Sequence, residues 1–509
     1  METIELGMDG MTLGDLARIA RQGALVALTP GAEERIRRAW QLVTRWVDEE
    51  RTVYGVTTGF GALSDVTISK SDTRQLQLNI LKSHAVGVGN PLAPDLVRAM
   101  MALRLKDFAR GNAGVRTETV AALIRLLNAG GVPVVPEKGS VGASGDLVPL
   151  AHMGLVLIGE GEVFLNGNRV SGREALEACG LVPLNLEAGE GLALINGTQA
   201  MTAIGGLAVY DAARLARHTD LAAAMSLEVL MGSKTEFDPR IHQMRPHPGQ
   251  AIAAENMDRI TRNSEIISSH RDCKRVQDAY TLRCSPQVHG ASRDAIAYAQ
   301  KVLETEMNSS TGNPLIHPES GTFLLGGNFH GQPVALAMDF MCMAVAELAN
   351  ISERRIERLV NPKLSGLPAF LVKDGGLNSG FMIAQYVAAA LVSENKVMSH
   401  PAVVDSIPTS ANKEDHVSMG TISARKCREV VQNAENVIAI ELMCAAQGLD
   451  LFTNMQPGAG TQSAYGVIRK VVPHLEKDRI LSEDVKRIVQ LIRSGEILDA
   501  VENAVGTVR

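Results

Sequence analysis

The strongest constraint on the fold is a set of long segments whose apolar residues lie on more than one helical face. They cover residues 332–359, 379–393 and 424–448, and an Ala-rich segment extends to about Met231. Helices that are apolar nearly all round belong in the middle of a large bundle or at a subunit interface. Aromatic residues are only 4% of the chain against 45% hydrophobic residues in all, a balance that favours helices over sheets. We therefore predict a mainly α fold.

Several shorter segments predict further helices and one small hairpin. Thr29 and Pro30 precede an amphipathic pattern that runs to about Glu50, and both are typical of the residues at which helices begin. The segment VFLNGNRV after Gly161 combines β-branched residues with an Asn-Gly turn, which is typical of a hairpin. Further helical patterns cover residues 73–89, 94–110, 117–127 and 294–307, and the last one covers residues 482–492 and beyond.

The charge pattern argues against a nucleic-acid partner. The formal net charge is −6, and acidic and basic residues are mixed along the chain, so no broad basic surface is expected. The glycine-rich stretches, such as LLGGNFHGQP, lack the Lys-Ser or Lys-Thr of a phosphate loop and show no βαβ pattern. Nucleotide binding is therefore not expected either.

We expect a cytoplasmic protein without membrane insertion, disulfides or a metal site. Residues 1–10 contain three acidic side chains and lack the basic start and apolar centre of a secretory signal. The longest apolar run, at 147–158, is interrupted by Pro149 and His152 and is too short to span a bilayer. The six cysteines show no CxxC pair, which favours reduced thiols, and no zinc-type spacing is present.

The stretch from Glu137 to Gly161, EKGSVGASGDLVPLAHMGLVLIGEG, contains the most distinctive chemistry. Two small residues, Ala143 and Gly145, flank Ser144 there. The backbone can therefore fold tightly enough for the amide nitrogen of Gly145 to approach the carbonyl carbon of Ala143. Ring closure and loss of water, including the Ser144 hydroxyl, would convert Ala-Ser-Gly into a methylidene-imidazolone, an electrophile built from the chain itself.

An ordinary helix start fits the same residues. Ser144 or Asp146, placed just before the apolar run that begins at Leu147, matches the pattern of a helix cap. Small tripeptides of this kind are common in proteins. The cofactor hypothesis therefore depends on the context in which the tripeptide stands.

Other polar and aromatic residues lie where a ligand could meet them. Tyr54 lies in the loop YGVTTGFGAL, His84 ends a helical segment, and Asn196 stands where a glycine-rich loop passes into a helix. Glu414 belongs to the polar loop DSIPTSANKEDHVSMG, which has the prolines and glycine of a shaped loop. Each of these residues also fits a structural role, as a packing residue, a local hydrogen-bonding residue, a helix cap or part of a solvated face.

The segment RVQDAYTLRCSPQVHGASR at residues 275–293 carries Gln277, Tyr280 and Arg283 at intervals of three. If the segment is helical, these side chains share one face and converge on one pocket. The planar guanidinium of Arg283 suits a substrate carboxylate because it can bind both oxygens, although a solvated arginine is the commoner case.

Motifs that extend from Tyr54 to about Gly448 agree in order and spacing with one known family. They are YGVTTGFG, KSHAVGVG, GSVGASGDLVPLAHM, GLALINGTQA, VQDAYTLRCSPQVHGASRD, GGNFHGQPVA and SIPTSANKEDHVSMG. By these motifs the chain resembles the aromatic amino acid lyases, the family of histidine, phenylalanine and tyrosine ammonia-lyases and the related aminomutases. Within this family the likeness is greatest to the histidine-specific lyases.

The resemblance implies a fold and an assembly. The fold would be that of the ammonia-lyase/fumarase-like superfamily, a long central helical bundle with a smaller N-terminal region. Residues 1–200 would form that region and carry the cofactor loop, and residues 201–509 would form the bundle and the C-terminal helices. The subunits would assemble as a homotetramer with shared active sites.

The resemblance also implies a reaction and a set of residue roles. L-histidine would lose ammonia to give trans-urocanate, with the methylidene-imidazolone of Ala143, Ser144 and Gly145 as the electrophile and no external cofactor. The other roles would fall to Asn196 near the oxygen of the cofactor, Tyr54 as the favoured base for the β-proton, Arg283 on the substrate carboxylate, Tyr280, Phe329 and Gln277 along the pocket, and His84 and Glu414 at the imidazole, with Glu414 also considered for proton transfer.

Two residues depart from the family pattern and leave the substrate open. Gly312 stands where these enzymes commonly carry Asp, and Lys413 stands where they commonly carry Gln. Lys413 adds a positive charge next to Glu414 and so bears on how that carboxylate meets the substrate. The alternative function is a tyrosine or phenylalanine ammonia-lyase, or a 2,3-aminomutase, with the same cofactor; a non-catalytic helical scaffold is the third hypothesis.

Tyr54 can act as a base only if nearby positive charge lowers the pKa of its hydroxyl.

Overall fold

The computed structural model describes the chain except for residues 1, 65, 67, 70–71 and 271–275. The chain forms two compact units, each made of segments that are distant in the sequence. Residues 1–210, 299–339 and 401–425 form the first unit, and residues 211–298, 340–400 and 426–509 form the second.

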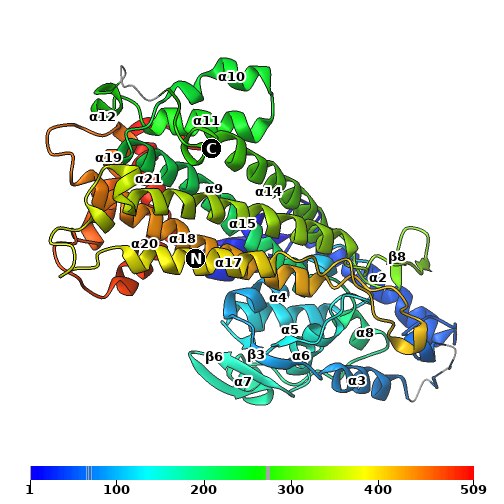
Figure 1. Cartoon of the computed structure of the whole chain (residues 1–509). Coiled ribbons are helices and arrows are strands. Elements are labelled where there is room, and N and C mark those ends of the chain that lie inside the picture. Colours follow the sequence, from blue (N-terminus) through cyan, green and yellow to red (C-terminus); the bar gives the residue numbers. More distant parts are fainter. Residues whose placement is uncertain (1, 65, 67, 70–71, 271–275) are drawn as a thin grey trace. The chain divides into compact units, whose positions relative to one another are not determined.

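Helices dominate both units, and four long helices contribute residues to each of them (Figure 1). These are α9 (Gln199–Val229), α14 (Ser285–Met307), α15 (Gln332–Val360) and α18 (Gly420–Leu449). The other α-helices of the first unit are α1 (Leu13–Arg21), α2 (Pro30–Asp48), α3 (Thr73–His84), α4 (Pro94–Ala109), α5 (Thr117–Asn128), α6 (Leu147–Leu157), α7 (Gly172–Ala178) and α8 (Glu190–Ile195). Those of the second unit are α10 (Pro239–Met244), α11 (Pro248–Ile260), α12 (Glu265–Ser268), α13 (Tyr280–Arg283), α16 (Pro362–Ser365), α17 (Met382–Met398), α19 (Ala459–Val471), α20 (Leu481–Ser494) and α21 (Glu496–Val505).

The described strands are short, and all of them belong to the first unit. β1 (Thr3–Leu6) pairs in parallel with β2 (Leu25–Leu28), while the other pairs are antiparallel. They comprise β3 (Val88–Pro91) with β5 (Pro136–Lys138), β4 (Val132–Pro133) with β6 (Glu162–Leu165), β6 with β7 (Asn168–Ser171), and β8 (Leu315–His317) with β9 (Thr322–Leu324). The predicted hairpin is confirmed as β6 and β7, and its turn residues Asn166 and Gly167 have φ angles of 50° and 80°.

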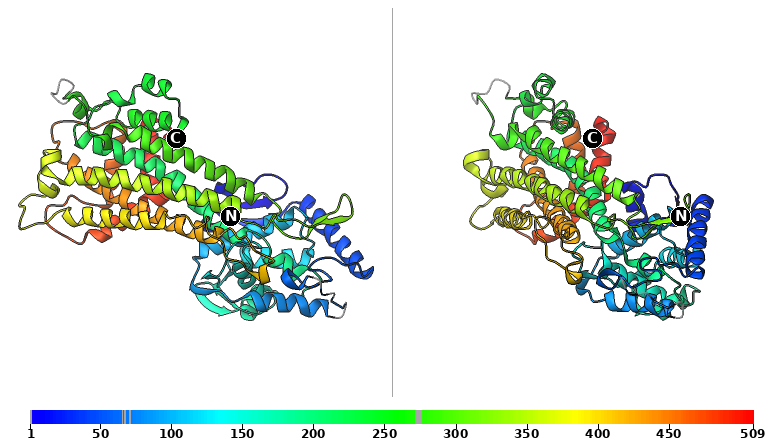
Figure 2. Two further views of the ribbon diagram at one scale, coloured as in Figure 1. Left: turned by 45° about the vertical axis from the view of Figure 1, so that its right-hand side comes forward. Right: turned by 90° about the vertical axis from the view of Figure 1, so that its right-hand side faces the viewer.

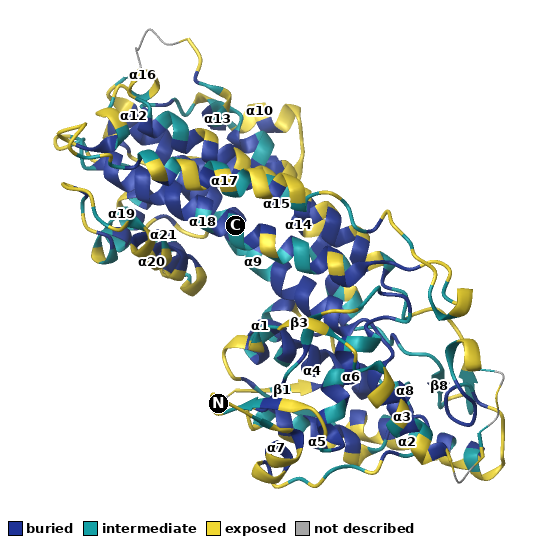
Figure 3. Cartoon of the chain, turned by 60° about the horizontal axis from the view of Figure 1, so that its bottom comes forward, coloured by how far each residue is buried: buried dark blue, intermediate teal, exposed yellow. Residues whose placement is uncertain are grey.

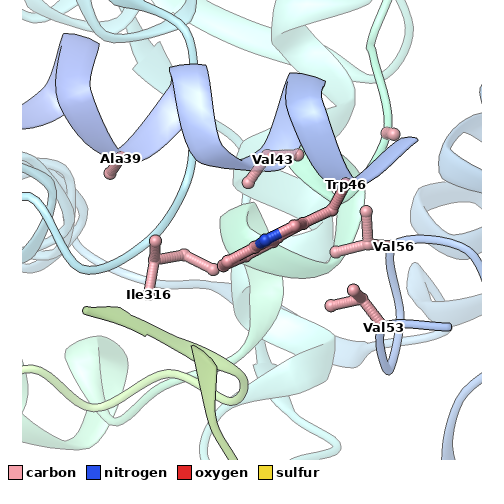
Figure 4. Close-up of a cluster of buried hydrophobic side chains, with 7 residues drawn as sticks. Ala39, Val43, Trp46, Val53, Val56 and Ile316 are labelled. Carbon is pink, nitrogen blue, oxygen red and sulfur yellow. The ribbon is translucent and has the colours of Figure 1, made fainter. Parts of the chain in front are cut away.

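Helix α2 shows how the sequence positions a loop that matters for the site. Thr29 accepts a hydrogen bond from the amide of Ala32, and Pro30 occupies the first turn, so the predicted start of the helix is confirmed. The buried face of α2 ends in Trp46, which packs against Val53 and Val56 in a cluster that Figure 4 shows. This contact fixes the loop that contains Tyr54.

The second unit contains a bundle of long helices. Figures 1 and 2 show the green, yellow and orange helices α9, α14, α15, α17 and α18 running alongside one another in this unit. In its interior Arg355 of α15 forms a fully buried ion pair with Glu441 of α18, which also accepts hydrogen bonds from Ser226 and Ser352. Buried charges are stable only when they are paired in this way.

The prediction that the long apolar helices are buried is confirmed for most of their length (Figure 3). Among the described residues, α15 is the one helix long and apolar enough to cross a membrane, with a mean hydropathy of 1.7, but 61% of that stretch is buried in the structure. Helix α17 differs from the others, because only Ala384, Ala388 and Asn395 are buried along its length.

Candidate active site

The Ala-Ser-Gly tripeptide lies in a tight loop of the first unit, between β5 and α6, that leaves no room for side chains at its glycines. Gly145 has a φ of 71°, and a Cβ atom there would lie 2.1 Å from the carbonyl oxygen of Gly197. Gly142 has a φ of 68°, and its Cβ would lie 2.2 Å from the hydroxyl of Ser418. Only glycine tolerates both the left-handed backbone and the close approach. Neighbouring atoms therefore pack closely against the chain on both sides of Ala143 and Ser144, and only glycine fits at these two positions.

Asp146 stands at the N-cap position of α6, but its side chain does not cap that helix. Its carboxylate accepts hydrogen bonds from the amide of Met201 at 2.7 Å and from the hydroxyl of Ser140 at 2.9 Å, and also from Thr421. Its own amide donates to the carbonyl oxygen of Gly197 at 2.7 Å. Burial raises the pKa of this carboxyl, and these donors oppose that shift. The helix-cap interpretation is therefore wrong for this side chain, which anchors the loop to α9 and α18 instead.

Asn196 meets the backbone of the tripeptide. Its side-chain amide nitrogen donates a hydrogen bond to the carbonyl oxygen of Ser144 at 3.1 Å. Asn196 is buried at the C-cap of α8, and the neighbouring Gly197 adopts a φ of 147°. The amide thus faces the oxygen that would become the carbonyl of a methylidene-imidazolone, which is where negative charge would develop.

Glu414 also meets the tripeptide. One carboxylate oxygen accepts a hydrogen bond from the hydroxyl of Ser144 at 2.9 Å, and the other accepts one from Thr409 at 2.7 Å. Backbone hydrogen bonds between Thr409 and Glu414 close the loop that holds the carboxylate. Among the residues that the structure describes, Lys413 forms no ion pair with Glu414.

Tyr54 lies half-buried in the same unit, and its hydroxyl accepts a hydrogen bond from the amide of Gly61 at 3.0 Å. Burial raises the pKa of this hydroxyl, the amide of Gly61 opposes the shift, and the charge of Glu414 adds to it. The expected positive charge that would lower the pKa of Tyr54 is not supplied by the described groups of this unit. The described charge that acts on this pKa is the carboxylate of Glu414, so the positive charge that a tyrosine base requires stays a prediction.

His84, at the end of α3, is fixed by its own helix. Its Nδ1 lies 2.8 Å from the carbonyl oxygen of Ile80 and 3.1 Å from the Ser83 hydroxyl, and its ring packs on Phe60 at a centroid distance of 5.2 Å. Burial lowers the pKa of His84, while the Ile80 carbonyl and the charge of Glu414 act in the opposite direction. The imidazole is therefore held as a neutral group at neutral pH.

Phe329 is half-buried in the loop before α15. The next residue, His330, approaches the carbonyl oxygen of His416 with its Nε2 at 3.1 Å, and the two imidazoles stack at 5.7 Å. These contacts join the loop of Phe329 to the loop of Glu414 within the first unit.

Gln277, Tyr280 and Arg283 belong to the second unit. The prediction of one continuous helical face for them is wrong, because α13 covers only Tyr280–Arg283 and Gln277 precedes it in irregular backbone. Tyr280 is 70% exposed, and its ring lies 4.7 Å from the guanidinium carbon of Arg283. Gln277 and Arg283 line one cavity of this unit. Arg275, at the start of the predicted segment, lies outside the described residues.

Sequence reasoning missed several residues that position the site, above all Arg104 in α4. This arginine is fully buried and donates to the carbonyl oxygens of Ala193 and Asn196, at 2.6 and 3.0 Å, and to the side chain of Gln199. The sequence of α4 could have indicated this role. The helix is apolar nearly all round yet carries Arg104, Lys106 and Asp107, and buried charged side chains require partners. In the described part of the chain no group of three or more His, Cys, Asp or Glu side chains lies together as a metal site.

Comparisons with known proteins define the class of this helical protein, which is a carbon–nitrogen lyase. The model of the family described as aromatic amino acid lyase matches residues 11–470. The chain is 57% identical to a histidine ammonia-lyase of Alkaliphilus oremlandii over 505 residues, which are 99% of each protein. It also resembles the crystal structures of a histidine ammonia-lyase from Trypanosoma cruzi (44% identity, TM-score 0.92, 99% and 96% of the two chains) and of a tyrosine aminomutase from Streptomyces globisporus (37% identity, TM-score 0.93, 100% of both chains).

The chain belongs to the aromatic amino acid lyase family. The predicted family, the mainly α fold and the assignment as an enzyme are thereby confirmed.

Proposed function

We propose that this chain is an ammonia-lyase that removes ammonia from L-histidine and releases trans-urocanate. The observation that carries this function is the 57% identity, over 99% of both chains, to a relative named histidine ammonia-lyase. The similarity to a tyrosine aminomutase along the whole chain is the reason to keep a tyrosine or phenylalanine lyase or aminomutase as the second candidate.

Ala143, Ser144 and Gly145 would form the methylidene-imidazolone. In this step the nitrogen of Gly145 bonds to the carbonyl carbon of Ala143, and two molecules of water leave, one with the oxygen of that carbonyl and one with the Ser144 hydroxyl. The tight packing of the loop supports the step, because Gly145 lies close against Gly197 and the next residue, Asp146, is anchored by the amide of Met201. When formed, the group supplies an electrophilic methylidene that draws electrons from the substrate.

The residues of the first unit would support this chemistry from two sides. The Asn196 amide would stabilise negative charge on the Ser144 carbonyl oxygen, to which it already donates. Glu414 would lose its hydrogen bond from the Ser144 hydroxyl when that hydroxyl leaves as water. One of its carboxylate oxygens would then be free to accept from the substrate imidazole, while Thr409 holds the other.

The remaining site residues would bind the substrate and move its proton. Arg283 would take the carboxylate, and Tyr54 would remove the β-proton once positive charge from the assembled site or the substrate lowers its pKa. His84, held neutral, would contact the substrate ring. Tyr280, Gln277 and Phe329 would complete the pocket.

Association of several copies, as a cytoplasmic homotetramer, is part of the proposal. Large apolar side chains are exposed on two helices of the second unit: Phe340 (47%) and Met343 (43%) on α15, and Ile383 (55%), Tyr386 (61%) and Val387 (47%) on α17. On each helix these side chains recur at intervals of three or four residues and so share one face, and an exposed apolar face is typical of a subunit interface. Light scattering of the purified protein would measure the number of subunits, and a monomer would contradict this part.

An ultraviolet assay with L-histidine, L-tyrosine and L-phenylalanine in separate reactions tests the function. Urocanate from L-histidine alone is the expected product, whereas coumarate, cinnamate or a β-amino acid would establish the second candidate. Ser144→Ala tests the cofactor, because it removes the hydroxyl that ring closure must expel. The variant should keep the full mass of its chain and lose nearly all activity; wild-type turnover in this variant would contradict the proposal.

A further inference from the structure

A small cavity lies beside Asn196 in the first unit. Its volume is about 20 Å³, and its lining includes Arg104, Asp107, Asn196 and Gly312. This volume is enough for one water molecule and too small for an organic ligand.

Two residues that line the cavity each keep one buried polar atom without a hydrogen-bond partner. They are Oδ1 of Asn196, an acceptor, and Nε of Arg104, a donor. The orientation of the Asn196 amide is fixed, because its nitrogen must face the carbonyl oxygen of Ser144. The two terminal nitrogens of Arg104 are used on Ala193, Asn196 and Gln199, and one of them also lies 3.4 Å from the carboxylate of Asp107. Buried polar atoms of this kind are normally satisfied by a protein group or an ordered water.

Gly312 contributes to the lining of this cavity without a side chain. A Cβ atom at Gly312 would meet only the carbonyl oxygen of Asn196, at 3.8 Å, so that the space next to it is open. Thr311, the preceding residue, accepts hydrogen bonds from Thr198 and Gln199, which keeps this loop next to the turn that contains Asn196.

We propose that the cavity binds one water molecule, which donates a hydrogen bond to Oδ1 of Asn196 and accepts one from Nε of Arg104. A hydrogen bond to the oxygen of an amide polarises it and strengthens donation by its nitrogen. The water thereby increases the stabilisation that Asn196 gives to the Ser144 carbonyl oxygen, a role that rests on the proposed function. An ammonium ion does not fit the same site, because it has no acceptor for Nε of Arg104.

A crystal structure of the parent enzyme and kinetics of Gly312→Ala test the proposal. The parent enzyme should show an ordered water within hydrogen-bonding distance of both Oδ1 of Asn196 and Nε of Arg104. The alanine methyl group should occupy this space, exclude the water and lower kcat about fivefold, as expected for one lost hydrogen bond. The ultraviolet absorbance of the cofactor and the loss of water in the intact mass should be the same in both proteins.

The matched control is Gly466→Ala in α19, where a Cβ atom would likewise meet no close neighbour. It should leave kcat unchanged. A parent structure without the water overturns the site whether or not the variant folds, and a Gly312→Ala enzyme with parental kcat overturns its role. If the parent enzyme forms no cofactor, the proposed function is contradicted. The proposal of a bound water is still tested in that case, because electron density in the cavity shows whether the water is present.

Discussion

The side-chain nitrogen of Asn196 lies 3.1 Å from the carbonyl oxygen of Ser144, 52 residues away in the chain. Arg104 holds the turn that carries Asn196, and Gly197, the next residue, accepts a hydrogen bond from the amide of Asp146. The loop with the reactive tripeptide and the turn with its donor are therefore one structural element. Function depends on this element in several ways that can be measured.

Asn196→Ala removes the donor to the Ser144 carbonyl oxygen. We expect kcat to fall by about a hundredfold to a thousandfold, the usual effect of losing one donor to a developing oxyanion. The intact mass should still show the loss of water that accompanies cofactor formation. A variant with a normal cofactor and a kcat within about threefold of the parent would show that this hydrogen bond does not assist catalysis.

Gly145→Ala should prevent cofactor formation, because the new Cβ would lie 2.1 Å from the Gly197 carbonyl oxygen. Mass spectrometry should then give the uncyclised chain. Gly161→Ala is the matched control, since Gly161 has a similar φ of 68° but its Cβ would meet nothing closer than 3.5 Å. If both variants lose the cofactor, backbone strain and not the contact with Gly197 is responsible.

Thr409→Val removes the hydroxyl that donates to Glu414 at 2.7 Å and keeps the shape of the side chain. Without this bond the carboxylate is less well oriented, so KM for L-histidine should rise about tenfold, as for a lost hydrogen bond to a charged group. Steady-state kinetics measure the effect, with the cofactor absorbance as the control for folding. An unchanged KM would argue against contact between Glu414 and the substrate.

Arg355→Met leaves the carboxylate of Glu441 buried without its partner. The free energy of unfolding should fall by about 3–5 kcal/mol. The double variant with Glu441→Met should recover much of this loss, because no charge then remains buried. Urea unfolding measures both. Arg169→Met, which breaks the exposed pair with Glu162, is the control and should leave the midpoint unchanged.

His218 makes stability depend on pH. Burial lowers the pKa of its imidazole to about 3. In the unfolded chain the same group titrates near 6.5, so below that pH the unfolded state binds a proton that the folded state does not. The free energy of unfolding should therefore fall by about 2 kcal/mol between pH 7 and pH 5 through this group. His218→Gln should show a smaller difference between the two pH values in urea unfolding, and an equal difference would contradict this assignment.

The local structure of the helices was predictable from the sequence. The cap and proline at the start of α2, the Asn-Gly turn between β6 and β7, and the apolar character of α9, α15 and α18 act over a few residues and need no knowledge of distant contacts. The tripeptide itself was also visible, because only small residues permit its ring closure.

The tertiary structure alone decided how the side chains around the tripeptide are used. The carboxylate of Asp146 accepts from the amide of Met201 and does not cap its own helix, the hydroxyl of Thr409 donates to Glu414, and the charge of Glu414 raises the pKa of Tyr54. Gln277 lies outside the helix that its spacing indicated. The buried guanidinium of Arg104 in α4 likewise donates to a distant segment, at the carbonyl oxygen of Asn196. Periodicity describes neighbours three or four residues apart, whereas these hydrogen bonds and pKa shifts depend on groups brought together by packing.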